Sequence, residues 1–139
     1  MEQFAAFVLD HAVLTFLFLG LLGALVWTSI PAVGGGQVSP ADAVRLMSHE
    51  DAVVIDLRPD AEFRNGHIVN AVHVPIDQIE GRLGRLGKYR QKPVIAACRT
   101  GQQSANAVKR LRTEGFERVH RLQGGMMAWQ SAELPITKD

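Results

Sequence analysis

Apolar residues are gathered into one long run near the N-terminus and into several short runs further along the chain. Residues 12–30 contain no Asp, Glu, Lys or Arg, and a helix over them would be apolar on every side. As a helix this run would extend over ~28 Å, about the thickness of the hydrocarbon core of a bilayer. Pro31 and the glycines at positions 34–36 predict the end of that helix. We therefore predict a membrane anchor over residues 1–31, with its transmembrane part at about 12–30, followed by a Gly-rich linker over residues 32–38.

Two other interpretations of the apolar run are weaker. A cleaved signal peptide would carry Lys or Arg before the run, whereas here Glu2 and Asp10 precede it, and the run is longer than the apolar region of an ordinary signal. A core helix buried on all sides would need more surrounding protein than the ~100 residues that follow can supply. A single-pass anchor is the interpretation that the pattern favours.

The remaining residues, 39–139, alternate between helical and strand patterns. Ser39, Pro40 and Asp42 predict a helix start, with the serine as N-cap and the proline in the first turn. Predicted strands cover 52–57, 71–74, 93–97 and 116–122, and predicted helices cover 39–48, 76–83, 104–114 and 124–129. This alternation predicts an α/β fold, with a parallel sheet of about five strands and helices on both faces.

Composition adds limits to the possible functions. The chain has 139 residues, of which 47% are hydrophobic and 21% charged, values that indicate one globular domain rather than a disordered chain. A formal net charge of +1 is too small to indicate a nucleic-acid partner. Cys98 is the only cysteine, which excludes an intramolecular disulfide and a Cys-rich zinc site. We expect neither a metal nor another cofactor.

The distribution of charge predicts an orientation for the anchor. Every Lys and Arg lies at or after Arg45, on the C-terminal side of the apolar run. By the positive-inside rule, the N-terminus would lie outside and residues 39–139 in the cytoplasm, held at the inner membrane by a single pass. A free thiol at Cys98 agrees with this placement, because cytosolic thiols stay reduced.

Candidate chemistry follows the predicted strand at 93–97. Cys98 comes directly after this strand, a short loop containing Gly101 follows, and a helix begins at Ser104. Ligand sites of parallel sheets lie at the carboxyl ends of strands, and the N–H groups of such a loop can surround an anion together with the helix N-terminus. A lone cysteine is more often a small buried hydrophobe. The strand–loop–helix context instead favours a thiolate, the nucleophilic form of cysteine.

Four ordered motifs in residues 39–139 resemble those of a single-domain rhodanese, a sulfurtransferase homology domain. They are Asp56-Leu57-Arg58 with Glu62-Phe63, Gly66-His67-Ile68 with Asn70-Ala71 and Pro75, Cys98-Arg99-Thr100-Gly101, and Gly124-Gly125 with Trp129 and Pro135. The resemblance covers almost all of this region and implies a rhodanese-like fold. Together with the predicted anchor, the chain is similar to membrane-tethered bacterial rhodanese-like proteins.

The resemblance implies transfer of sulfane sulfur. Cys98 would take sulfur from a small anionic donor such as thiosulfate, become a persulfide, and pass the outer sulfur to cyanide, to a cellular thiol or to a protein acceptor. Backbone N–H groups of the loop would hold the persulfide, and Arg99 would add positive charge for the donor. The residues expected to bind substrate are Arg99, Thr100, Gly101, Gln102 and Gln103.

Two loop positions depart from related patterns. Gln103 is neutral at the sixth position, where many rhodaneses carry a basic residue, so thiosulfate would bind weakly or would not be the donor. Ser104 stands where phosphatase and arsenate-reductase relatives carry an arginine, so the bidentate clamp for a phosphate is missing. Two alternatives stay open, namely a relay of sulfur to a protein and a catalytically weak, membrane-tethered interaction module.

Other residues are expected to support the site or the core. Asp56 and Arg58 lie at the C-terminal end of a predicted strand. Contact with substrate is one interpretation, and an Arg–carboxylate pair that fixes the neighbouring loops, with Glu62 as another candidate partner, is the favoured one. His67 has two interpretations, a general base or a buried residue with its ring bonded to the backbone, and the second is favoured. Trp129 would pack in the core.

Overall fold

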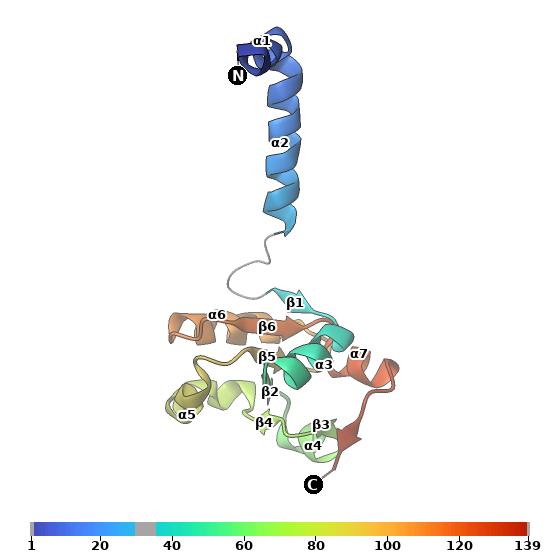
Figure 1. Cartoon of the computed structure of the whole chain (residues 1–139). Coiled ribbons are helices and arrows are strands. Elements are labelled where there is room, and N and C mark those ends of the chain that lie inside the picture. Colours follow the sequence, from blue (N-terminus) through green and yellow to red (C-terminus); the bar gives the residue numbers. More distant parts are fainter. Residues whose placement is uncertain (1, 30–35, 139) are drawn as a thin grey trace. The chain divides into compact units, whose positions relative to one another are not determined.

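The computed structural model describes residues 2–29 and 36–138. The chain forms two compact units, Met1–Val33 and Gly34–Asp139 (Figure 1). The predicted cysteine site belongs to the larger, C-terminal unit.

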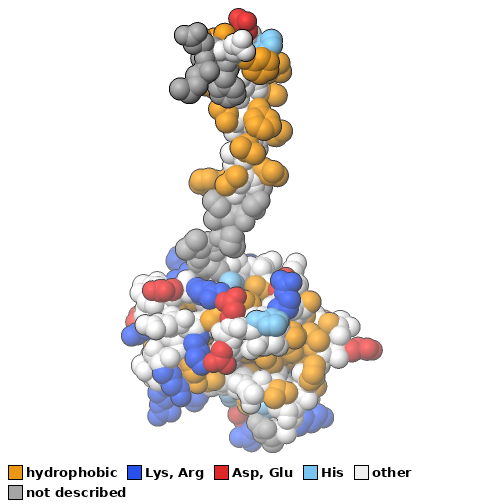
Figure 2. All heavy atoms as spheres, in the orientation of Figure 1, with side chains coloured by type: hydrophobic (Ala, Val, Ile, Leu, Met, Phe, Trp, Pro, Cys, Tyr) orange, Lys and Arg blue, Asp and Glu red, His pale blue; other side chains and the backbone are white. Residues whose placement is uncertain are grey.

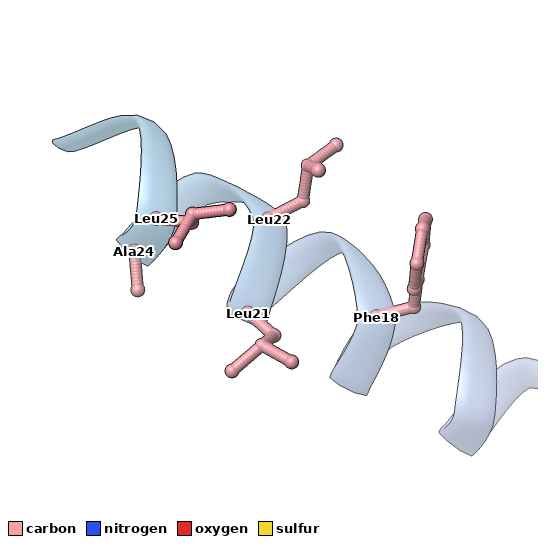
Figure 3. A pocket seen from close by; sticks show the side chains of 5 residues that line it. All are labelled: Phe18, Leu21, Leu22, Ala24 and Leu25. Atoms are coloured by element: carbon pink, nitrogen blue, oxygen red, sulfur yellow. The ribbon is translucent and has the colours of Figure 1, made fainter. Parts of the chain in front are cut away.

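The described part of the N-terminal unit consists of helices α1 (Glu2–Asp10) and α2 (Ala12–Ser29). Figure 2 shows apolar side chains along the surface of α2. Figure 3 shows five of them projecting from successive turns, namely Phe18, Leu21, Leu22, Ala24 and Leu25. Because these five belong to one helix, the hollow that they line is an open surface and not an enclosed cavity.

The transmembrane prediction for residues 12–30 is not confirmed. Within the stretches 2–29 and 36–138, no helix has both the length and the apolar character required to cross a membrane. Ile30 and Pro31, at the end of the predicted anchor, and linker residues 32–35 lie outside the described residues.

The larger unit is built on a five-stranded parallel sheet, as the sequence predicts. Its strands lie in the order β1 (Gln37–Val38), β6 (Val119–Leu122), β5 (Val94–Ala97), β2 (Val53–Asp56) and β4 (Val72–His73). All neighbouring strands are parallel. In the centre of the sheet, Ile55 of β2 lies opposite Ala96 of β5 on one side and Val72 of β4 on the other.

Helices cover both faces of this sheet. Side chains of α5 (Ile79–Leu86) and α6 (Ser104–Thr113) pack on one face, and those of α3 (Pro40–His49) and α7 (Gly125–Ser131) pack on the other. Successive residues of β5 alternate between the two clusters, because side chains along a strand point to opposite faces. Cys98 belongs to the cluster on the α5 and α6 side, with Val94 and Ala96.

Several short elements were not predicted. Helix α4 (Asp60–Arg64) follows β2, 3-10 turn η2 (Gly87–Tyr89) follows α5, and β3 (His67–Ile68) pairs antiparallel with β7 (Ile136–Thr137). The helix predicted at 76–83 begins as 3-10 turn η1 (Ile76–Gln78) and continues as α5. The indole Nε1–H of Trp129 donates to the carbonyl of Pro135 at 3.0 Å, and so ties the C-terminal segment to α7. Trp129 is buried in the core, as predicted.

Strand β1 lies within the segment that the sequence assigned to the linker. Gln37 pairs with Arg121 and Val38 with Leu122, so the paired part of the unit begins before residue 39. Two residues are too few to show an alternating pattern, and long-range pairing defines this strand. Ser39 then caps α3 as predicted, with its Oγ accepting the N–H of Asp42 at 3.1 Å.

His120 on β6 predicts a loss of stability in acid. Both ring nitrogens are buried and have no hydrogen-bond partner among the described residues. Burial lowers the pKa of His120, and the charges of Arg118 and Arg112 lower it further, while Glu50 acts in the opposite direction. The unfolded chain therefore binds a proton at its ordinary His pKa of ~6.5, at a pH where the folded chain does not.

We expect the free energy of unfolding to fall as the pH decreases from roughly 7 through the lowered pKa of His120. Replacing His120 with leucine should make this decrease shallower. Urea unfolding followed by circular dichroism at several pH values measures both slopes. Equal slopes for the two proteins would contradict the prediction.

Candidate active site

A cleft of about 380 Å³ lies beside the segments that follow β2 and β5. It is lined by Arg58, Pro59, Glu62, Cys98, Arg99, Thr100, Gln102 and Gln103. The predicted nucleophile and four of the five predicted substrate-binding residues therefore line one cleft. Gly101 and Asp56 do not line it, but each bonds to a residue that does, Gly101 to Cys98 and Asp56 to Arg58.

The loop after β5 curls back onto the cysteine sulfur. Cys98 is 1% exposed, and the N–H of Gly101 donates to its Sγ at 3.0 Å. Gly101 has a φ of +92°, and a Cβ there would lie 3.3 Å from the Gly124 nitrogen and from the Leu122 oxygen. Both the backbone conformation and the close approach favour glycine. An N–H aimed at Sγ favours negative charge on the sulfur.

Ser104 closes the other end of the loop. This residue begins α6 and is fully buried. Its hydroxyl donates to the carbonyl oxygen of Gly101 at 2.9 Å. The position at which phosphatase-type loops need an arginine is therefore occupied by a short side chain whose hydroxyl already bonds to the backbone.

Helix α7 holds the same loop from the outside. The N–H of Met126 donates to the carbonyl of Cys98 at 2.8 Å, and the N–H of Met127 donates to the carbonyl of Arg99 at 3.1 Å. In a trans peptide the C=O and the following N–H point in opposite directions. The N–H groups of Arg99 and Thr100 consequently point away from α7. These two bonds fix the direction in which the loop presents its donors.

Gly125 permits this contact between α7 and the loop. It has a φ of +59°, and a Cβ on it would lie 2.3 Å from the Cys98 oxygen and 2.7 Å from the Arg99 carbonyl carbon. Any side chain would separate the helix from the loop. Sequence reasoning assigned Gly124-Gly125 only to a motif and a helix start. The signal available was a glycine pair between a strand and a helix, which indicates close backbone approach.

Asp56 and Arg58 form the predicted Arg–carboxylate pair. Arg58 Nη2 lies 2.7 Å from Asp56 Oδ2, and its Nε donates to Oδ1 at 3.0 Å. Both residues are buried. Arg58 Nη2 also donates to the Gly66 carbonyl at 2.8 Å, which joins β2 to the turn before β3. The charge of Arg58 is thus matched by Asp56, and no ion pair links Arg58 to Glu62 in the described structure.

Glu62 pairs instead with Arg99. Arg99 Nε donates to Glu62 Oε2 at 3.2 Å, and Nη2 donates to Oε1. The side chain of Arg99 is 66% exposed and that of Glu62 is 26% exposed. The hydrogen bond from Arg99 holds the pKa of Glu62 below its ordinary value; burial acts against this shift, and the charges of Arg99 and Arg58 add to it. Arg99 therefore lines the cleft with its charge already paired.

A ring stack supports the helix that carries Glu62. Phe63 stacks on His67 and on His73, with ring centroids 3.7 and 4.2 Å apart. His67 is buried and its Nδ1 lies 2.8 Å from the Phe63 carbonyl, which confirms the predicted bond to the backbone. His73 Nε2 lies 2.8 Å from the Arg58 carbonyl.

Within residues 2–29 and 36–138, no cluster of His, Cys, Asp and Glu is arranged to hold a metal ion.

The fold and this loop define a class of α/β domains with a cysteine at the end of a central parallel strand. Residues 39–132 match the rhodanese-like domain family. The chain is 31% identical to the uncharacterized protein YibN of Escherichia coli K12, over 99% of both chains. It is 35% identical to the thiosulfate sulfurtransferase GlpE of Glaesserella parasuis, over 72% of this chain and 91% of that one. The protein described here belongs to the rhodanese-like family.

A solved structure agrees with this assignment. The crystal structure of a rhodanese-related protein from Thermoplasma volcanium matches with a TM-score of 0.67 at 25% sequence identity. The match covers 74% of this chain and 98% of the other. It extends the agreement from sequence to the arrangement of strands and helices.

Replacing Gly125 with alanine should disrupt the cysteine loop. The added methyl group would collide with the Cys98 carbonyl, and an L-residue at this φ is strained. We expect a loss of stability of about 1–3 kcal/mol. If Cys98 accepts sulfur, as the family resemblance implies, its loading should slow by roughly tenfold or more, because the displaced backbone N–H groups no longer stabilise negative charge on the sulfur. Urea unfolding and intact-mass kinetics measure the two effects.

Gly81→Ala is the matched control. Gly81 lies within α5, and a Cβ there would have no atom within 4 Å. Alanine at this position should stabilise the protein by about 0.5–1 kcal/mol and leave loading unchanged. Loading by Gly125→Ala at the wild-type rate would show that the contact with α7 does not position the loop.

Proposed function

We propose that this chain is a sulfurtransferase that carries sulfane sulfur on Cys98 as a persulfide. The observation that carries this proposal is the bond from the Gly101 N–H to Cys98 Sγ, within a loop whose carbonyls are fixed by α7. Such a loop stabilises negative charge on a cysteine sulfur before and after sulfur is added. The proposed donor is a small sulfane-sulfur compound, of which thiosulfate is the simplest.

The proposed reaction has two displacement steps. In the first, the Cys98 thiolate attacks the outer sulfur of the donor, a new S–S bond forms, and the donor S–S bond breaks. With thiosulfate, sulfite leaves with the electron pair of that bond. In the second step, cyanide or a thiolate attacks the outer sulfur of the persulfide. The Cys98–sulfur bond then breaks and Cys98 returns to the thiolate.

Family membership supports this chemistry. Relatives named as sulfurtransferases occur in Glaesserella parasuis and in Allochromatium vinosum, at 35% and 37% identity. The loop does not support phosphoryl transfer, because Ser104 stands where an arginine would have to hold the phosphate. A relay of sulfur to a protein acceptor would use the same persulfide and differs only in the second step.

Intact-mass spectrometry of the full chain in mild detergent tests the persulfide directly. After incubation with thiosulfate or with cysteine persulfide, the wild-type mass should increase by one sulfur atom, and cyanide should reverse the gain. Cys98→Ser should gain nothing, because Cys98 is the only cysteine.

Circular dichroism should show that both proteins are folded. A missing mass increase then means that Cys98 has not reacted, and not that the chain is unfolded. A folded wild-type chain that gains no sulfur from either donor would rule out the transferase. The catalytically weak interaction module would then be the better account.

We further propose that the N-terminal segment attaches the chain to the inner membrane, with the rhodanese-like unit in the cytoplasm. Support comes from the sequence of residues 12–30, which carries no charge, and from the exposed apolar side chains of α2. Exposed apolar surface of this extent is unfavourable in water. The absence of Lys and Arg before Arg45 favours the cytoplasmic placement.

Fractionation of cells that produce the full chain tests this attachment. The chain should sediment with the membranes and stay there after an alkaline carbonate wash, which removes peripheral proteins. A chain starting at residue 36 should remain in the supernatant. Recovery of the full chain in the supernatant would contradict the attachment and leave the proposed chemistry unaffected.

A further inference from the structure

The cations of the cleft are already neutralised by carboxylates. Arg58 and Arg99 are the only Lys or Arg residues that line the cleft in the described structure. Arg58 donates three side-chain hydrogen bonds to the carboxylate of Asp56, and Glu62 is paired with Arg99 through both of its oxygens. An incoming anion therefore finds no guanidinium without a carboxylate partner in this cleft.

The rest of the lining adds no positive charge. Thr100, Gln102 and Gln103 are neutral and exposed. The donors that remain for an anion are backbone N–H groups, the Thr100 hydroxyl and the side-chain amides of Gln102 and Gln103, and none of these groups carries a positive charge. Thiosulfate carries two negative charges and would approach a Cys98 thiolate, so its binding depends strongly on nearby cations.

We propose that Glu62 determines donor specificity, by neutralising Arg99 and so disfavouring dianionic donors relative to low-molecular-weight organic persulfides. This inference rests on the proposed persulfide function and narrows its donor class. The cleft has room for the organic group of such a donor, with a volume of about 380 Å³. Glu62 acts here through Arg99 and does not itself contact the reacting sulfur.

The two donors differ in charge at the reacting end. With an organic persulfide R–S–SH, the Cys98 thiolate attacks the outer sulfur, a new S–S bond to Cys98 forms, the S–S bond of the donor breaks, and RS⁻ leaves with the electron pair of that bond. The proton stays on the transferred sulfur, and the single negative charge moves from Cys98 to RS⁻. With thiosulfate, three negative charges share the site throughout the step. Removing the charge of Glu62 should therefore raise the loading rate with thiosulfate far more than the loading rate with the persulfide.

Position favours Glu62 for this role over a general surface carboxylate. Glu62 lies on α4, whose neighbouring Phe63 ring is stacked on His67 and His73. It is 26% exposed, against 64% for Glu80, which forms a comparable pair with Arg110 and does not line the cleft. The carboxylate is thus held at the cleft by the packing of its helix as well as by Arg99.

Single-turnover loading of Cys98 by the full chain tests the proposal, with thiosulfate and cysteine persulfide as donors and intact mass as the readout. Glu62→Gln should raise the second-order loading rate with thiosulfate about fivefold and leave that with cysteine persulfide within about twofold. The thiosulfate concentration that gives half-maximal loading should fall, and the maximal loading rate should stay the same. It should shrink as ionic strength rises, because salt screens exposed charges.

Glu80→Gln is the matched control, since it removes an equivalent charge from an exposed ion pair outside the cleft. It should leave both donor rates unchanged. Gln103→Lys provides a second arm that keeps the Glu62–Arg99 pair intact. This variant should also raise the thiosulfate rate, because it adds a cation without a carboxylate partner at the cleft.

The outcomes separate the inference from the function on which it rests. If wild type takes sulfur from neither donor, the proposed function fails, and the inference fails with it. If wild type is loaded but Glu62→Gln does not change the ratio of the two rates beyond that of Glu80→Gln, only the inference is overturned, whatever the effect of Gln103→Lys. A selective, salt-sensitive gain for thiosulfate in both variants supports it.

Discussion

Two hydrogen bonds between α7 and the loop after β5 set the direction of the N–H groups around Cys98. They hold the Cys98 and Arg99 carbonyls against the N–H groups of Met126 and Met127. Because the peptide unit is planar and trans, holding the carbonyls on one side turns the following N–H groups to the other. Gly125 allows the approach, and Gly101 turns the chain so that its own N–H reaches Sγ. The parallel sheet and its covering helices serve to bring these segments together.

Charge pairing is a second constraint on the site. A loop of N–H groups attracts anions without discriminating strongly among them, so the nearby full charges decide which anion is bound. Arg58 is bonded to the Asp56 carboxylate and to the Gly66 carbonyl, so it is a structural residue that borders the cleft. Arg99 forms an ion pair with Glu62. Under the proposed function, selection among sulfur donors would depend on how firmly that exposed ion pair is held.

Much of the fold could be predicted from sequence because its signals are local. The β-branched runs, the cap at Ser39 and the helix after Cys98 lie within short windows, and strand–helix alternation then requires a parallel sheet. Cys98, the loop residues and the Asp56–Arg58 pair were predicted for the same reason. The buried ring of His67 was also predicted correctly.

The remainder depends on contacts between distant segments. No local pattern shows that Gly125 touches the Cys98 carbonyl, that Glu62 reaches Arg99, or that Gln37 pairs with Arg121. The sequence predicts Arg99 as a cation for the donor, but it does not indicate that Glu62 pairs with Arg99. A glycine pair or an acidic residue can be noticed in a sequence, but its partner is defined only by the fold.

We propose that the loop, held by α7, presents its N–H groups to sulfur carried on Cys98. The most direct measurement is a high-resolution crystal structure of the full chain after loading with a sulfane donor. We predict an outer sulfur within hydrogen-bond distance of at least two loop N–H groups, with the Met126 and Met127 bonds to the loop intact. An outer sulfur directed away from these N–H groups, or a loop detached from α7, would contradict the account.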